Sequence, residues 1–264
     1  MNDHGLNPDG TIAREGSLDR VRPAFAPVVE AARAGIAEAF GPDRLHSAYV
    51  YGSVPRGTAT AGASDLDVQL ALHDEPTDAD RATARALEAA LDRALPQIDG
   101  AGILLSGRAT LLSNLERHDL GFFVACLCTP LLGPDLADDL PPYRPTSLLA
   151  RETNGDLARV LPGWRTRAAE GTDPLLGRHV GRRLVRTGFT LVMPRWGGWT
   201  SDLDRSAEIF GDHYPERAEQ MRRAVTAGRS RTAPEPKTLE ELIEDLGPWL
   251  AAEYTSVHGE KTPR

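Results

Sequence analysis

Two aspartates, Asp65 and Asp67, lie one residue apart at the start of an apolar segment. Side chains of a β-strand alternate between its two faces, so both carboxylates would share one face, roughly 6 to 7 Å apart along the strand. The opposite face would carry Leu66, Val68, Leu70 and Leu72. Two neighbouring anions repel each other unless a cation lies between them, and oxygen ligands of this kind suit a hard ion such as Mg2+. The pair therefore predicts a metal site on one face of a strand.

A Gly52-Ser53 pair directly follows a segment at positions 45–51 that reads as a strand. Glycine lets the backbone turn sharply and approach a ligand closely, while exposed N–H groups and the Ser53 hydroxyl can bind phosphate oxygens. Arg56 and Ser64, in the loop that leads to Asp65, are further candidates for nucleotide binding. A phosphate site beside a metal site is the outline of a centre for phosphoryl or nucleotidyl transfer.

Gly52-Ser53, eleven intervening residues and then Asp65-Leu66-Asp67 resemble the signature of the DNA polymerase β-type nucleotidyltransferase superfamily. The match is closest to its small bacterial members, the aminoglycoside nucleotidyltransferases and the minimal nucleotidyltransferases. Each piece alone also fits an ordinary turn or a solvated aspartate pair, but strand, turn, loop and strand follow in the required order. The resemblance implies an α+β protein, with an N-terminal nucleotidyltransferase domain (a mixed sheet flanked by helices) followed by a C-terminal all-helical domain.

Proline and glycine divide the chain into three parts. Residues 1–16 carry Asn-Pro and Asp-Gly turn signals and little to bury, which predicts a flexible arm. The catalytic domain is expected at 17–140 and the helical domain at 146–258, with a proline-rich boundary between them.

Periodicity places the main elements within these parts. Helices are expected over 25–40 and, after a capping box of Thr77 and Asp80, up to about residue 95. Strands are expected at 98–105 and 122–128. A helix at 148–161 is expected to end at Pro162-Gly163.

The resemblance also implies a third carboxylate near the start of the strand that follows the helix after the Asp-x-Asp strand. Asp99 is the best match in this sequence, although an aspartate before Gly100 is equally typical of a turn. On this basis Asp65, Asp67 and Asp99 are the predicted catalytic and metal-binding residues.

Arginines at four-residue spacing, Arg178, Arg182 and Arg186, form one stripe on a predicted helix. Guanidinium groups match phosphate oxygens, and related enzymes use basic residues on a helix of the second domain to hold a nucleotide. Arg182 and Arg186 are therefore candidates for binding the β- and γ-phosphates, while a solvated helix face is the alternative.

Two smaller groups have both structural and functional interpretations. Trp196, Trp199, Asp202 and Asp204 could shape an acceptor pocket, although core packing and helix capping explain them as well. Cys126 and Cys128 lie in an apolar run and are expected to be small core residues in a reducing compartment.

Composition limits the partners and the location. The chain of 264 residues has 41% hydrophobic and 26% charged residues, as in globular proteins, and a net charge of −8, which argues against general nucleic-acid binding. The polar N-terminus does not read as a signal peptide and no run is long enough to span a membrane, so a cytoplasmic protein is expected.

These features predict a Mg2+-dependent enzyme that moves a nucleoside monophosphate, AMP from ATP by analogy with relatives, to a hydroxyl of a small-molecule acceptor such as an aminoglycoside-like antibiotic. Two Mg2+ ions are expected at the aspartates. Two alternatives stay open: an antitoxin-type enzyme that adenylylates a protein partner, and a non-catalytic binding module on the same scaffold. The acceptor, the base of the nucleotide and the oligomeric state are not predicted.

Overall fold

A computed structural model describes residues 4–171 and 173–264. The chain forms two compact units. One consists of residues 13–143, and the other combines residues 4–12 with residues 144–264. The boundary between the two units falls after Tyr143.

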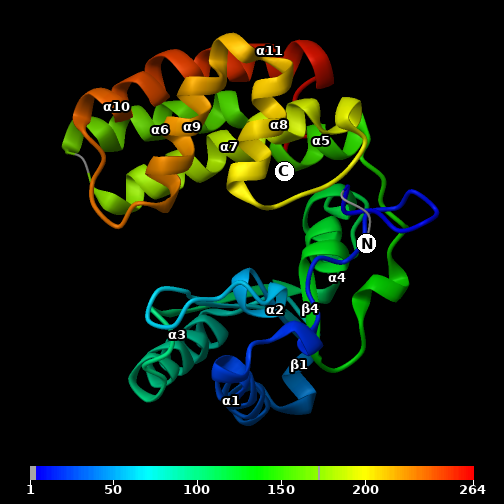
Figure 1. Ribbon diagram of the computed structural model, residues 1–264. Helices are drawn as coiled ribbons and strands as arrows, with labels where there is room; N and C mark the ends of the chain where they lie inside the picture. Colours follow the sequence, from blue (N-terminus) through cyan, green and yellow to red (C-terminus); the bar gives the residue numbers. More distant parts are fainter. Residues whose placement is uncertain (1–3, 172) are drawn as a thin grey trace. The chain divides into compact units, whose positions relative to one another are not determined.

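The unit of residues 13–143 is built on a four-stranded mixed sheet (Figure 1). Its strands are β1 (Leu45–Tyr51), β2 (Leu66–Leu72), β3 (Ala101–Gly107) and β4 (Cys128–Leu132), in the order β3-β2-β1-β4. β1 is antiparallel to β2 and to β4, whereas β2 and β3 are parallel. The mixed sheet that the motif predicted is therefore confirmed.

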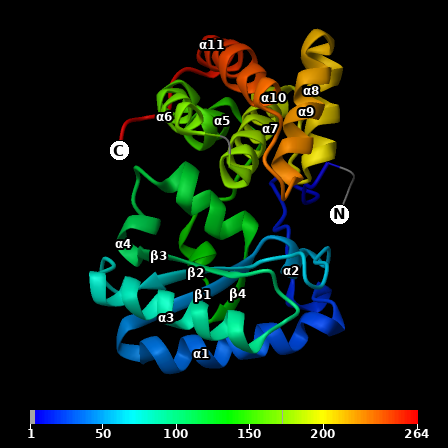
Figure 2. The ribbon, with the colours of Figure 1, turned by 90° about the vertical axis from the view of Figure 1, so that its left-hand side faces the viewer.

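Two helices cover one face of this sheet, α1 (Ala26–Arg44) and α3 (Asp78–Ala94), as Figure 2 shows. Their apolar residues pack on the inward-facing residues of the strands, including Leu66, Val68 and Leu70. Gly41, at φ +61°, breaks α1 where the sequence predicted its end. Thr77 and Asp80 form the predicted capping box at the start of α3.

The opposite face is only partly covered, by the chain between β3 and residue 140. This segment contains α4 (Arg108–Leu111) and two π-helical segments, Arg117–Gly121 and Phe123–Leu127, and buries Leu111 and Val124 against Tyr49 and Ala71. The prediction of a strand over 122–128 was wrong, because a continuous apolar run does not distinguish a buried strand from a buried helix. Of residues 122–128, only Cys128 belongs to a strand, β4.

Both cysteines are buried, and neither forms a disulfide. Burial raises the pKa of the Cys126 thiol to about 12 and raises that of Cys128 well above its ordinary value. They are core residues, as the sequence predicted.

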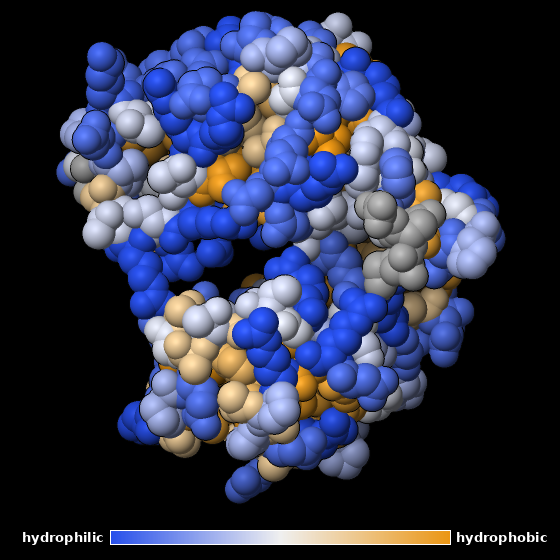
Figure 3. All heavy atoms as spheres, in the orientation of Figure 1, coloured by the Kyte–Doolittle hydropathy of each residue, from blue (hydrophilic) through white to orange (hydrophobic). Residues whose placement is uncertain are grey.

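The second unit is helical, and α7 lies at its centre. Its helices are α5 (Ser147–Asn154), α6 (Leu157–Glu170), α7 (Pro174–Trp196), α8 (Leu203–His213), α9 (Ala218–Arg229), α10 (Pro236–Glu241) and α11 (Gly247–His258). α7 packs against α8 and α9, and glycine permits a close approach, since a Cβ on Gly181 would lie 2.5 Å from Gly228 N. Hydrophilic residues dominate the face of this unit seen in Figure 3.

The first break between its helices differs from the prediction. Pro162 lies inside α6, and the chain turns instead at Gly155, whose amide donates to the Arg151 carbonyl over 2.9 Å. Pro162 is the sixth residue of α6 and lacks the N–H that would donate to the carbonyl four residues earlier, yet the helix continues through it. None of the helices in the described ranges is long and apolar enough to span a membrane.

The N-terminal segment also differs from the predicted flexible arm, apart from residues 1–3, which lie outside the described ranges. Residues 6 and 12 form an isolated β-bridge, and Trp199 N donates to His4 O over 2.8 Å. Arg144 Nη1 donates to Asp9 O over 2.7 Å. The segment is held by these hydrogen bonds and by the burial of Ile12, which is 4% exposed. Most of its residues are polar, so a search for apolar residues misses it.

Candidate active site on the sheet

The turn after β1 brings Gly52 against Asp67. Gly52 has φ +79° and ψ −146°, a conformation that residues with a Cβ rarely adopt. A Cβ atom built on Gly52 would lie 2.6 Å from Asp67 Oδ2. The Gly-Ser turn and the Asp-x-Asp motif therefore meet directly, although 13 residues lie between Gly52 and Leu66, the first residue of β2.

Ser53 opens α2 (Ser53–Arg56), a helix of four residues. The first N–H groups of a helix have no partner within it, so the start of α2 offers donors beside the Ser53 hydroxyl. The Ser53 carbonyl accepts from the Gly57 backbone at the end of α2, and Gly57 itself has φ +74°. Two glycines thus enclose the predicted phosphate turn.

A row of three residues crosses the sheet at Asp67. Tyr51 of β1 pairs with Asp67 of β2, and Asp67 pairs with Gly102 of β3. Paired residues project to the same face of a sheet, so Tyr51 and Gly102 flank the carboxylate. The Tyr51 ring contacts the Phe123 ring edge-on at a centroid distance of 4.8 Å, whereas no atom lies within 4 Å of a Cβ built on Gly102.

Asp65 directly precedes β2 and is half-buried, as is Asp67. Asp99 is exposed and precedes β3, and its amide donates to Ser64 O over 3.0 Å. The Ser64 hydroxyl accepts from the Thr60 amide over 2.9 Å and so closes the loop before Asp65. The predicted residues lie together at one end of the parallel β2–β3 pair.

The side chains of Asp65, Asp67 and Asp99 do not form a three-carboxylate metal site in this structure. Among the described residues, no group of three or more His, Cys, Asp or Glu side chains is arranged to hold a metal ion. On the Asp67 face, β3 carries Gly102, Leu104 and Ser106, so it supplies no acid there. The chemistry of the donors still fits Mg2+, because Asp65 and Asp67 provide hard oxygens and Mg2+ commonly takes one or two carboxylates plus phosphate oxygens and water.

Arg56 lies at the end of α2 and is bound on two sides. Its Nε donates to Gly52 O over 3.0 Å, and its Nη1 lies 3.7 Å from Glu15 Oε2. Sequence reasoning did not single out Glu15, because it falls in the segment that was expected to be a flexible arm. Gly102 and Tyr51 were also missed, and only the strand register places them beside Asp67.

The arginine stripe belongs to the helical unit. Arg178 and Arg182 are half-buried on α7, and Arg186 is exposed. Arg182 Nε donates to Gly228 O of α9 over 2.9 Å, so this side chain joins two helices.

The packing of Trp196 and Trp199 fits the interpretation of these residues as structural, which was the alternative to an acceptor pocket. Trp199 is 9% exposed and contacts Phe189 edge-on, and Trp196 stacks on His4 at 4.7 Å between ring centroids. The Asp202 carboxylate caps α8 by accepting an amide of its first turn over 2.8 Å.

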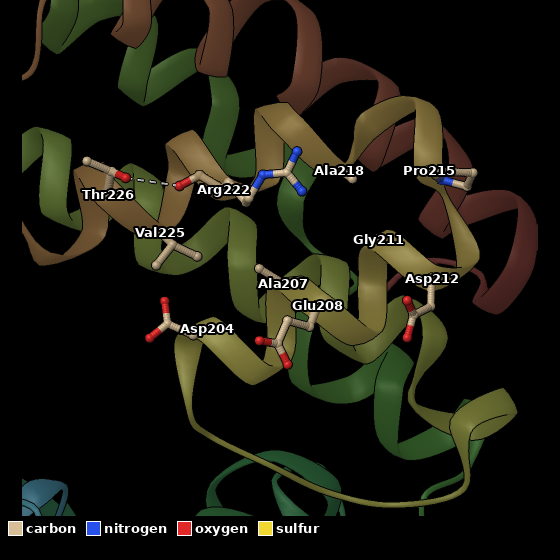
Figure 4. A pocket seen from close by; sticks show the side chains of 10 residues that line it. All are labelled: Asp204, Ala207, Glu208, Gly211, Asp212, Pro215, Ala218, Arg222, Val225 and Thr226. Atoms are coloured by element: carbon tan, nitrogen blue, oxygen red, sulfur yellow. Dashed lines mark hydrogen bonds between the residues drawn. The ribbon is translucent and has the colours of Figure 1, made fainter.

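A hollow of about 520 Å3 lies between α8 and α9, and Figure 4 shows the side chains around it. Its acidic residues include Asp204 and Glu208. Arg229 Nη2 lies 2.5 Å from Asp204 Oδ2, and Arg205 Nη1 lies 3.1 Å from Glu208 Oε2. Because these arginines balance the carboxylates, the hollow has no evident preference for a cation.

Comparison with known proteins gives a likeness among solved structures. No protein-family model matches this sequence, and no curated protein does. Among solved structures, spectinomycin adenyltransferase AAD(9) from Enterococcus faecialis, crystallised with ATP and spectinomycin, has a TM-score of 0.57 to this chain. The match covers 86% of this chain and 98% of that one at 12% sequence identity. The likeness is one of fold, and the fold of this chain is α+β, with a mixed sheet in one unit and helices in the other, as the resemblance of the motif implies.

Proposed function

We propose that the protein is a nucleotidyltransferase that moves AMP from ATP to a hydroxyl of a small-molecule acceptor. The observation that carries the proposal is the contact between Gly52 and Asp67, because it joins a phosphate-binding turn to a metal-binding carboxylate. The structural neighbour, crystallised with ATP and an antibiotic, supports this class of donor and acceptor.

Each residue has a defined task in this reaction. The turn at Gly52 and Ser53 binds the triphosphate, and Arg56 supplies positive charge beside it. Asp65 and Asp67 hold Mg2+, with Asp99 as a candidate for completing the site. When bound, the metal neutralises phosphate charge and lowers the pKa of the attacking hydroxyl.

The chemical step is an in-line displacement at the α-phosphorus. The acceptor oxygen forms the new P–O bond, the bond between the α-phosphorus and the bridging oxygen breaks, and pyrophosphate leaves. Positioning of the triphosphate by the turn provides much of the rate, since phosphoryl transfer depends on alignment and charge neutralisation. The hydroxyl proton passes to a carboxylate of the site or to water.

The first experiment measures thermal unfolding with each of the four NTPs, with and without Mg2+. A ligand at 100 times its dissociation constant stabilises by about 2.7 kcal/mol. We expect stabilisation by ATP that requires Mg2+ and that is lost in Asp65→Asn and Asp67→Asn. Asp43→Asn is the matched control, because Asp43 is an exposed carboxylate of the same unit, at the end of α1.

The second experiment follows transfer of label from α-labelled ATP to a panel of hydroxyl-bearing acceptors, including aminoglycosides. Labelled small molecules support the proposal, and labelled protein in a lysate would favour the protein-modifying alternative. Absence of any Mg2+-dependent shift with all four nucleotides would refute the donor site and favour a binding module.

A further inference from the structure

The side chain of Arg56 forms an ion pair with Glu15, which lies 41 positions earlier in the sequence. Glu15 Oε2 is 3.7 Å from Arg56 Nη1, and the Gly52 carbonyl accepts from Arg56 Nε over 3.0 Å. The Glu15 side chain is 16% exposed and that of Arg56 is 30% exposed, so water screens this pair less than a surface pair. A guanidinium carries its five N–H donors in one plane, so the hydrogen bond from Nε orients that plane, and the Glu15 carboxylate attracts its Nη1 edge electrostatically.

The backbone of Glu15 is itself held on both sides. Its amide donates to Cys126 O over 2.9 Å, and its carbonyl accepts from Arg20 Nη1 over 2.9 Å. The preceding Arg14 pairs with Asp135 at 2.7 Å. Glu15 therefore projects from a fixed segment.

The same segment packs directly against α2. Ser17 N donates to Pro55 O over 3.0 Å. A Cβ built on Gly16 would lie 2.9 Å from Pro55 Cβ and would also collide with Thr129 Oγ1, so only glycine allows this approach. The chain at positions 14–17 thus forms a support behind the phosphate turn.

We propose that Glu15 is a positioning residue for nucleotide binding, acting through Arg56. This inference rests on the proposed function, because it assigns Arg56 to the triphosphate. Holding a long side chain in its binding conformation before the ligand arrives reduces the entropy lost on binding. Glu15 does not touch the nucleotide in this scheme, and its effect disappears when Arg56 is absent.

A double-mutant cycle tests the proposal on the full chain. The dissociation constant for MgATP is measured by calorimetry for the wild type, Glu15→Gln, Arg56→Ala and the double variant. We expect Glu15→Gln to weaken binding about fivefold when Arg56 is present and to have no effect when it is absent. Glu15→Asp keeps the charge and should restore part of the affinity.

Glu30→Gln is the matched control, because Glu30 pairs with Arg33 on α1 at a similar 3.6 Å. Equal weakening by Glu15→Gln in both backgrounds would overturn the proposal, as would no weakening at all. Those results leave nucleotide binding by the wild type intact, so they differ from failure of the proposed function, in which the wild type binds no nucleotide. Thermal unfolding of each variant without ligand separates a loss of folding from a loss of positioning.

Discussion

The carboxylate of Asp67 lies directly over Gly52, where a Cβ atom would approach Asp67 Oδ2 to 2.6 Å. This relationship explains both halves of the motif. The turn requires glycine because φ is +79°, and the carboxylate can lie beside the phosphate turn only because that glycine has no side chain.

Gly52→Ala should abolish MgATP-induced stabilisation, because the new methyl group displaces Asp67 or opens the turn. Backbone strain alone should cost about 1–3 kcal/mol of unfolding free energy. Gly41→Ala provides the control: Gly41 has φ +61° but no atom within 4 Å of its Cβ position. It should lose stability and keep its response to MgATP, and the comparison needs only thermal unfolding with and without ligand.

Gly102→Asp should add a third carboxylate to the face that carries Asp67. Affinity for a divalent ion rises with the number of charged ligands, so Mg2+ should bind about tenfold more tightly. Without metal the added anion should lower the unfolding temperature, and Mg2+ should restore it. Leu104→Asp is the control, because it introduces the same charge on the same face of β3, opposite Gln69 instead of Asp67. A similar gain in Mg2+ affinity in Leu104→Asp would contradict the prediction.

Asp80→Asn should lower the free energy of unfolding by about 1–3 kcal/mol at pH 7. The hydrogen bond from Arg44, followed by those from Thr77, lowers the pKa of Asp80 although burial opposes them. A carboxyl group with a lowered pKa stabilises the fold fully above its unfolded pKa of about 3.8, and this contribution is lost as the pH falls toward the folded pKa.

The difference between wild type and Asp80→Asn should therefore be constant from pH 7 to pH 5 and shrink below about pH 4. Urea unfolding at several pH values measures it. Asp78→Asn, whose side chain is fully exposed in the first turn of α3, should show little change at any pH.

The sequence predicts that Arg182 and Arg186 of α7 both bind nucleotide, and two variants test this prediction separately for each residue. Arg182→Ala removes the donor to Gly228 O and should cost about 1 kcal/mol of stability. Arg186 is exposed, so Arg186→Ala should leave stability within about 0.5 kcal/mol while weakening MgATP binding. Unchanged MgATP affinity in Arg186→Ala would remove this residue from the proposed nucleotide site.

Local rules predicted the elements that depend on neighbouring residues. The capping box of Thr77 and Asp80 requires only four consecutive residues, and alternation around Asp65 and Asp67 requires only one strand. The motif also predicts β1 and β2, because these two strands come directly before and after its turn and loop.

Long-range relationships could not be predicted in the same way. The role of Glu15 depends on hydrogen bonds to Cys126 and Arg20, and no local pattern contains them. The apolar run at 122–128 became π-helical because burial favours either structure and the packing decides. In the sequence, Gly102 only weakens the prediction of a strand. Its place beside Asp67 depends on the register between β2 and β3, which no local pattern gives.

The division of the chain has a consequence for its synthesis. The sheet unit is a continuous stretch, residues 13–143, and can fold as soon as it leaves the ribosome. Residues 4–12 belong to the other unit and contact Arg144 and Trp199, so they must wait until those residues have been made. A segment that is translated before the sheet unit therefore reaches its native contacts only after that unit has been translated.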